Sequence, residues 1–76
     1  MQPQLNYEEL KSSYKRFLKN PPKNEFSRWY NDFMFLNSLI EFAKSANLDK
    51  DVFEFQQKRK VAYSKLHELG YQIEEG

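Results

Sequence analysis

Few side chains in this sequence could carry out acid–base or metal chemistry. His67 is the only histidine, and the chain has no cysteine. A catalytic or metal-bound histidine needs partners of that kind, whereas a histidine in the last turn of a helix is simply stabilised by the helix dipole. The serines have no neighbouring base, and no glycine-rich phosphate loop is present. We therefore predict a protein that is not an enzyme and has no catalytic residue, cofactor or metal site.

The acidic residues Asp49, Asp51 and Glu54 lie close together and superficially suggest a calcium loop. Such a loop needs a central glycine and a bidentate glutamate at its last position, and both are missing here. The same acids fit the start of a helix, where a side-chain oxygen accepts a backbone N–H. Asp49 and Asp51 are both suitable capping residues, so this helix has two candidate starts.

The segment around these acids resembles part of a helix-turn-helix DNA-binding motif. The alanine, glycine and two apolar positions of that motif are occupied here by Ala43, Asn47, Leu48 and Phe53, with asparagine in place of glycine. Gln56 stands where a further apolar residue is expected, and the neighbouring acids would face phosphate. The resemblance implies DNA binding by a degenerate form of the motif.

Basic residues form rows in two other segments of the chain. The rows consist of Lys11, Lys15, Arg16 and Lys19 near the start and Lys58, Arg59, Lys60 and Lys65 towards the end. The net charge is only +1, so bulk charge does not favour nucleic acid as a partner. If the two segments are helices that lie side by side, parts of the rows could merge into one nucleic-acid-binding patch. Arg59 falls within an apolar stripe, where we expect its stem to lie on apolar surface and its head in water.

All of these residues must be positioned around the most aromatic stretch, residues 24–47, which contains no proline or glycine. Its apolar side chains form one broad helical face and a second stripe beside it. Together they cover roughly 240° of the helix, where a surface helix typically shows a stripe of ~100°. The second stripe, here called the aromatic flank, consists of Phe35, Leu39, Phe42 and Ala46. We expect the flank to be left uncovered by the rest of the chain and to bind another protein or a second copy.

Local signals place the first two helices. Asn6 and the glutamate three residues later form a capping box that starts a helix over 7–19. Pro21 follows the end of that helix, because proline restricts the residue before it and cannot donate an amide hydrogen. Asn24 is then a suitable cap for a central helix over 25–46.

The third helix is placed by the turns around it. Asn47 can adopt the left-handed conformation that ends the central helix, and the third helix is expected over 51–69. Gly70 suits the position just after its last turn. Residues 1–4 and 72–76 are expected to fray.

These elements predict a single all-α domain over residues 1–76, a small three-helix bundle that self-association could complete. We expect a small non-enzymatic protein-binding module, such as a regulator, inhibitor or assembly subunit, that acts through the aromatic flank. The alternative is a nucleic-acid-binding protein that uses the basic rows or the degenerate helix-turn-helix. The sequence starts without the basic and apolar regions of a signal peptide and has no long apolar run, so we expect a cytoplasmic location and no membrane partner.

Overall fold

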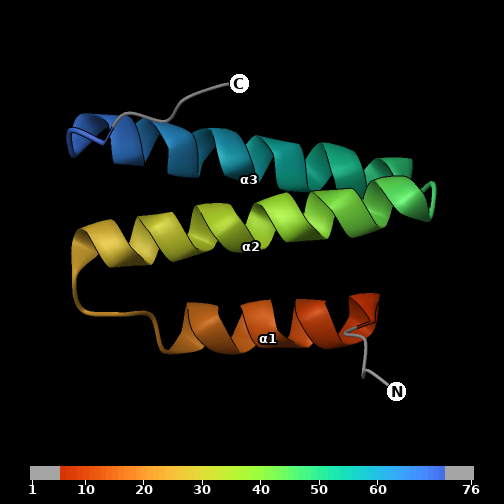
Figure 1. Ribbon diagram of the computed structural model, residues 1–76. Coiled ribbons are helices and arrows are strands. Elements are labelled where there is room, and N and C mark those ends of the chain that lie inside the picture. The colour runs from red at the N-terminus through yellow and green to blue at the C-terminus, as the bar shows by residue number, and fades with distance from the viewer. Residues whose placement is uncertain (1–5, 72–76) are drawn as a thin grey trace, which may run out of the picture.

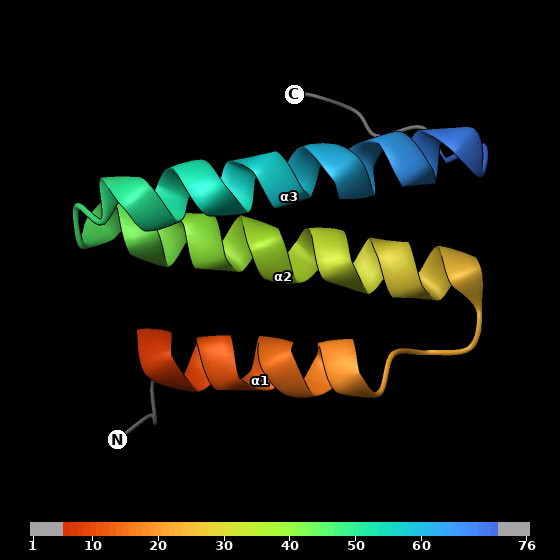
Figure 2. The same ribbon diagram turned by 180° about the vertical axis from the view of Figure 1, so that it is seen from behind.

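The predicted all-α fold is confirmed by a computed structural model, which describes residues 6–71. Helices α1 (Tyr7–Lys19), α2 (Glu25–Ser45) and α3 (Asp49–Glu68) follow one another up, down and up, with α2 in the middle of the view (Figure 1). The same order is seen from behind (Figure 2). The predicted fraying of the two termini concerns residues outside the described part. Within residues 6–71, no helix is both long and apolar enough to cross a membrane.

Asparagine side chains start the first two helices, as the sequence predicts. The Asn6 Oδ1 atom accepts the backbone N–H of Glu9 at 2.8 Å. The Asn24 Oδ1 atom accepts the N–H of Ser27 at 2.9 Å. Each bond satisfies a donor that the first helical turn would otherwise leave unpaired, which is why these helices begin at the predicted residues.

Left-handed residues end the second and third helices. Asn47 has φ 58°, and the N–H of Leu48 reaches back to the carbonyl of Ala43 at 2.9 Å. Gly70 has φ 90°, and the N–H of Tyr71 bonds to the carbonyl of Leu66 at 3.0 Å. Both are Schellman motifs, in which a residue past the helix satisfies a carbonyl of the last turn.

The predicted limits of α2 and α3 need small corrections. Helix α2 ends at Ser45 rather than at 46, and α3 covers Asp49–Glu68 rather than 51–69. Leu48 occupies the N-cap position of α3, and no side chain caps this helix. The tight turn at Asn47 leaves only residues 46–48 between α2 and α3, so α3 starts directly after Leu48 and neither proposed aspartate acts as its cap.

The core lies mainly between α2 and α3 and is closed on a second side by α1. The most deeply buried large side chains are Leu36, Leu39 and Ile40 of α2 and Leu66 of α3. Burying a side chain of this size contributes about 1.5–3 kcal/mol relative to leaving it exposed. Both outer helices pack on α2, but no Cα atom of α1 lies within 8 Å of one in α3. The side of the bundle between α1 and α3 is therefore open at the level of the backbone.

Candidate protein interface

Helix α1 covers half of the aromatic flank. Leu39 is fully buried, with an exposed fraction of 0%, and Phe35 is partly buried. The ring of Phe35 lies between those of Tyr14 and Phe17, at centroid distances of 5.5 and 5.3 Å. The expectation that the chain leaves these two flank residues uncovered is wrong, because three aromatic rings fill the space between α1 and α2.

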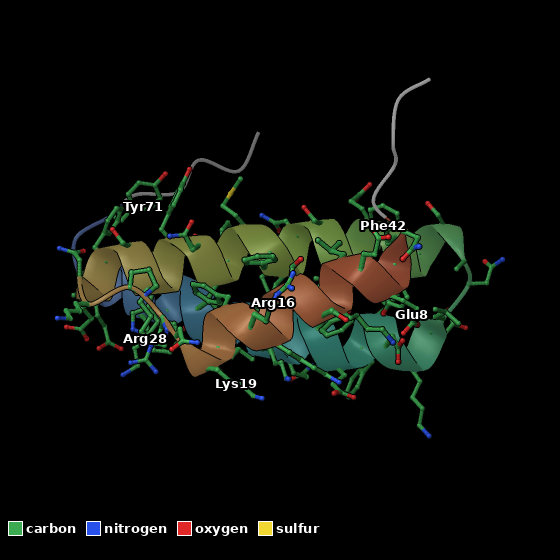
Figure 3. The ribbon with its side chains drawn as sticks, turned by 90° about the horizontal axis from the view of Figure 1, so that it is seen from below. Glu8, Arg16, Lys19, Arg28, Phe42 and Tyr71 are labelled. Carbon is green, nitrogen blue, oxygen red and sulfur yellow. The ribbon has the colours of Figure 1, made fainter. Side chains whose placement is uncertain are left out.

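The other half of the flank is accessible. Phe42 is 39% exposed, and its ring stacks on that of Tyr7 at 6.4 Å. Ala46, one turn further along, is also exposed. Phe42 projects at one edge of the bundle when the molecule is viewed from below (Figure 3). Binding of a partner by the flank therefore stays a prediction for these two residues.

A shallow groove lies along the junction of α1 and α2. It has a volume of about 210 Å³ and is lined by Leu10, Asn31, Met34, Phe35 and Ser38. This surface is here called the α1–α2 groove. No charged side chain lines it, and the thioether of a methionine adapts readily to differently shaped apolar partners. The groove is thus suited to an apolar side chain of another molecule.

Met34 is not among the residues predicted from the sequence, yet its side chain is 47% exposed, compared with 39% for Phe42. It lies one turn before Ser38 and two turns before Phe42, on the same ridge of α2. A search for residues four apart, counted back from Phe42, would have found it. The accessible apolar ridge of α2 therefore consists of Met34 and Phe42, with Ser38 between them.

A buried hydrogen-bonded pair, Tyr14 of α1 and Asp32 of α2, joins these two helices. The hydroxyl of Tyr14 donates to the Asp32 Oδ1 atom at 2.6 Å, and both residues are buried. Burial raises the pKa of Asp32 above its ordinary value, opposed by the bond from Tyr14 and by the nearby charges of Lys58 and Arg28. Burial, together with the same bond, also raises the pKa of Tyr14. The pair fixes the position of Tyr14 and hence of the aromatic layer under the α1–α2 groove.

A second tyrosine ties the start of α1 to α3. The hydroxyl of Tyr7 donates to the Asp51 Oδ2 atom at 2.8 Å, and partial burial with this bond raises the pKa of Tyr7. Asp51, a candidate cap in the sequence, therefore serves a different purpose in the structure. Because Phe42 stacks on Tyr7, this bond also positions the accessible half of the flank.

The two basic rows come together only in part. Lys11, Lys15 and Lys58 line a common groove between α1 and α3. Arg16 instead contacts Ser13 at 3.3 Å on α1 itself. The remaining basic residues of the predicted rows, which do not line that groove, are Lys19, Arg59, Lys60 and Lys65.

Arg59 is partly buried and bonds to α2. Its Nη1 atom donates to the Asn37 Oδ1 atom of α2 at 2.9 Å in a partly buried bond. The expectation that its head lies free in water is wrong, because an amide acceptor on α2 lies opposite it. This bond engages one of the five N–H donors of the Arg59 guanidinium.

The helix-turn-helix interpretation is wrong in its geometry. In that motif the two helices cross at about 90–120°. Helices α2 and α3 instead lie side by side and antiparallel, as both ribbon views show (Figures 1 and 2). Contacts between Phe33 and Tyr63 and between Asn37 and Arg59 join them well beyond the turn. The resemblance reflects the short turn at Asn47, whose left-handed conformation also suits the glycine that the motif has there.

No family model, curated protein or solved structure matches the chain significantly. Within residues 6–71, no group of three histidine, cysteine, aspartate or glutamate side chains converges to hold a metal ion. The fold defines a small all-α bundle, and its function must be inferred from the surface of these helices.

Proposed function

We propose that the protein is a small non-enzymatic binding module that docks an apolar segment of another protein along the ridge of Met34 and Phe42. A regulator, an inhibitor or an assembly subunit would each work in this way. The observation that carries the proposal is the exposure of these two large apolar side chains on one ridge of α2, beside an uncharged groove. Exposed apolar groups that cluster with aromatic residues are typical of interface centres.

The spacing of the ridge suggests the form of the partner segment. Met34 and Phe42 are two helical turns apart, which corresponds to about 12 Å along the helix. An amphipathic helix presents apolar residues at matching intervals, and recognition of a helix in a groove uses such anchors. Burial of Met34 and Phe42 by a partner helix would remove apolar surface from water without desolvating any charged group in the α1–α2 groove.

The test is site-specific photo-crosslinking from the middle of the ridge. A photoreactive phenylalanine analogue replaces Ser38, and the protein is irradiated in extract of its native host. We expect a discrete adduct that persists at about 0.5 M salt, because the contact is apolar. The substitutions Met34→Glu and Phe42→Glu should each abolish it.

The matched control is Val61→Glu, which places the same charge at an apolar residue of α3 that is 51% exposed. The control should leave the adduct intact. An adduct that survives the ridge substitutions, or is lost equally in the control, would refute the proposal. An adduct between two copies of this chain would show that the ridge binds a second copy rather than a foreign protein.

A further inference from the structure

The opposite side of α1 borders a second and larger groove. This α1–α3 groove has a volume of about 340 Å³. Its lining comprises Lys11, Tyr14, Lys15 and Leu18 of α1 and Asp51, Glu54, Phe55 and Lys58 of α3. Since the two helix backbones do not approach within 8 Å, only side chains separate the groove from the core. Three helices packed in this way leave one long side of a bundle unfilled.

The groove has an apolar floor and a charged rim. Tyr14 and Phe55 are buried beneath it, whereas Leu18 is 49% exposed. Lys11 pairs with Glu8 of its own helix at 3.3 Å. Lys15 and Lys58 have no ion pair among the residues that the structure describes. The rim therefore offers two free cations beside an exposed leucine.

Charge is distributed unevenly along the groove. Asp51 and Glu54 lie in the first turns of α3, near the turn that joins it to α2. The lysines continue towards the other end, where Lys19 follows Lys15 by one turn. Figure 3 shows Lys19 and Arg28 at this end of the molecule and Glu8 at the opposite end. The groove is thus cationic at the end of α1 and acidic near its start.

From this geometry we infer that the α1–α3 groove binds a fourth helix, supplied by a partner protein, which is amphipathic and acidic in its N-terminal half. Such a helix would run antiparallel to α1 and α3, as in an up-down-up-down bundle. Its N-terminal acids would then face Lys15 and Lys58 in the groove and Lys19 one turn beyond it, and basic residues near its C-terminus would face Asp51 and Glu54. This distribution is also the one that the dipole of the incoming helix favours.

The spacing of the lysines supports a helical ligand. Lys11, Lys15 and Lys19 are each four residues apart, which corresponds to steps of about 6 Å along α1. Acidic residues four apart on an incoming helix have the same step. An apolar residue between them would cover Leu18 and the floor of the groove.

Nucleic acid fits the groove less well. Asp51 and Glu54 lie in the same lining and would repel phosphate. Its aromatic rings, those of Tyr14 and Phe55, are buried and offer no face on which bases could stack.

The inference is independent of the proposed function, because the two grooves lie on different sides of α1. The test uses a fluorescent synthetic peptide of about three heptads, with leucine at positions a and d. Glutamates flank the leucines in its first half and lysines in its second half. Fluorescence anisotropy measures its binding to the full chain.

We expect micromolar binding that weakens about tenfold between roughly 50 and 500 mM salt. The variants Lys15→Glu and Lys58→Gln should each weaken it at least about fivefold. A peptide with the order of charges reversed should bind about tenfold more weakly. The matched control Lys60→Glu changes an exposed lysine of α3 outside the groove, and Met34→Glu changes the other groove; both should bind normally, with helix content checked by circular dichroism.

Absence of binding would overturn the inference, and so would equal affinity for the two peptides. Tighter binding of a DNA oligonucleotide, lost in the same lysine variants, would assign the groove to a polyanion and overturn it as well. Loss of peptide binding in Met34→Glu but not in the lysine variants would place the peptide in the α1–α2 groove and overturn the inference. Normal binding by the lysine variants would also overturn it, without affecting the proposed function.

Discussion

Removal of the Tyr14 hydroxyl should destabilise the bundle out of proportion to the single atom lost. In Tyr14→Phe the ring still packs against Phe35, but the buried Asp32 carboxylate loses its 2.6 Å donor. A hydrogen bond to a charged group contributes about 1.5–3 kcal/mol, and a buried charge without a partner costs at least as much. We therefore expect the free energy of unfolding to fall by about 2 kcal/mol at pH 7. Urea unfolding, followed by circular dichroism, measures this change.

The effect should depend on pH with a definite sign. Burial raises the pKa of Asp32, so the folded protein holds this proton more tightly than the unfolded chain does. The contribution of Asp32 to stability is therefore greatest below its ordinary pKa of 3.8 and is lost as pH rises through the folded value. Tyr14→Phe removes a bond that lowers this pKa, so the variant should lose more stability than the native protein as pH rises. The cost of the substitution should thus shrink on acidification.

The control for this experiment is Tyr7→Phe. It removes a hydroxyl bond of similar length, 2.8 Å, to Asp51, which is only half-buried. Its cost should be about 1 kcal/mol or less, because solvent can replace the lost donor. If Tyr14→Phe costs no more than Tyr7→Phe, or costs the same at pH 4 as at pH 7, the Tyr14–Asp32 pair does not hold α1 in place.

Three further predictions concern other parts of the structure, and denaturant unfolding checks each of them. Leu39→Ala should cost about 3 kcal/mol because the residue is fully buried, whereas Phe53→Ala, at a largely exposed side chain, should stay within about 0.5 kcal/mol; similar values for both would contradict the packing described. Asn47→Gly should be neutral or slightly stabilising and Asn47→Val should cost about 1 kcal/mol, because φ is 58°; equal stability of the two would argue against the left-handed turn. Asp32→Asn should gain stability relative to the native protein as pH rises from about 4 to 7, since an amide does not ionise; a constant difference over that range would show that Asp32 does not titrate in the folded protein there.

Features fixed by neighbouring residues could be predicted from the sequence. Asn6 and Asn24 cap helices because the acceptor and donor lie three residues apart. Asn47 and Gly70 end helices because asparagine and glycine adopt the positive φ that most other residues avoid. The predicted start of α3 is wrong because Asp49 and Asp51 are both suitable capping residues, whereas the turn places Leu48 at the N-cap position.

Features fixed by tertiary packing could not be predicted in the same way. Helical periodicity shows how much of α2 is apolar, but it does not show which side α1 covers. Leu39 was therefore expected at the surface, while Met34, on the polar side of α2, was overlooked. The Tyr14–Asp32 bond joins residues 18 apart in the sequence, and no local signal reveals such a pair.

The proposed interface is tested most directly by the methyl resonance of Met34, one of only two methionines in the chain. The protein is labelled with carbon-13 at the methionine methyl groups, and spectra are recorded with and without the partner identified by crosslinking. We expect the Met34 methyl signal to shift on binding and to lose its relaxation enhancement from a soluble paramagnetic probe, because the partner covers it. A partner that binds while the Met34 methyl group stays unshifted and fully accessible to the probe would contradict the proposal.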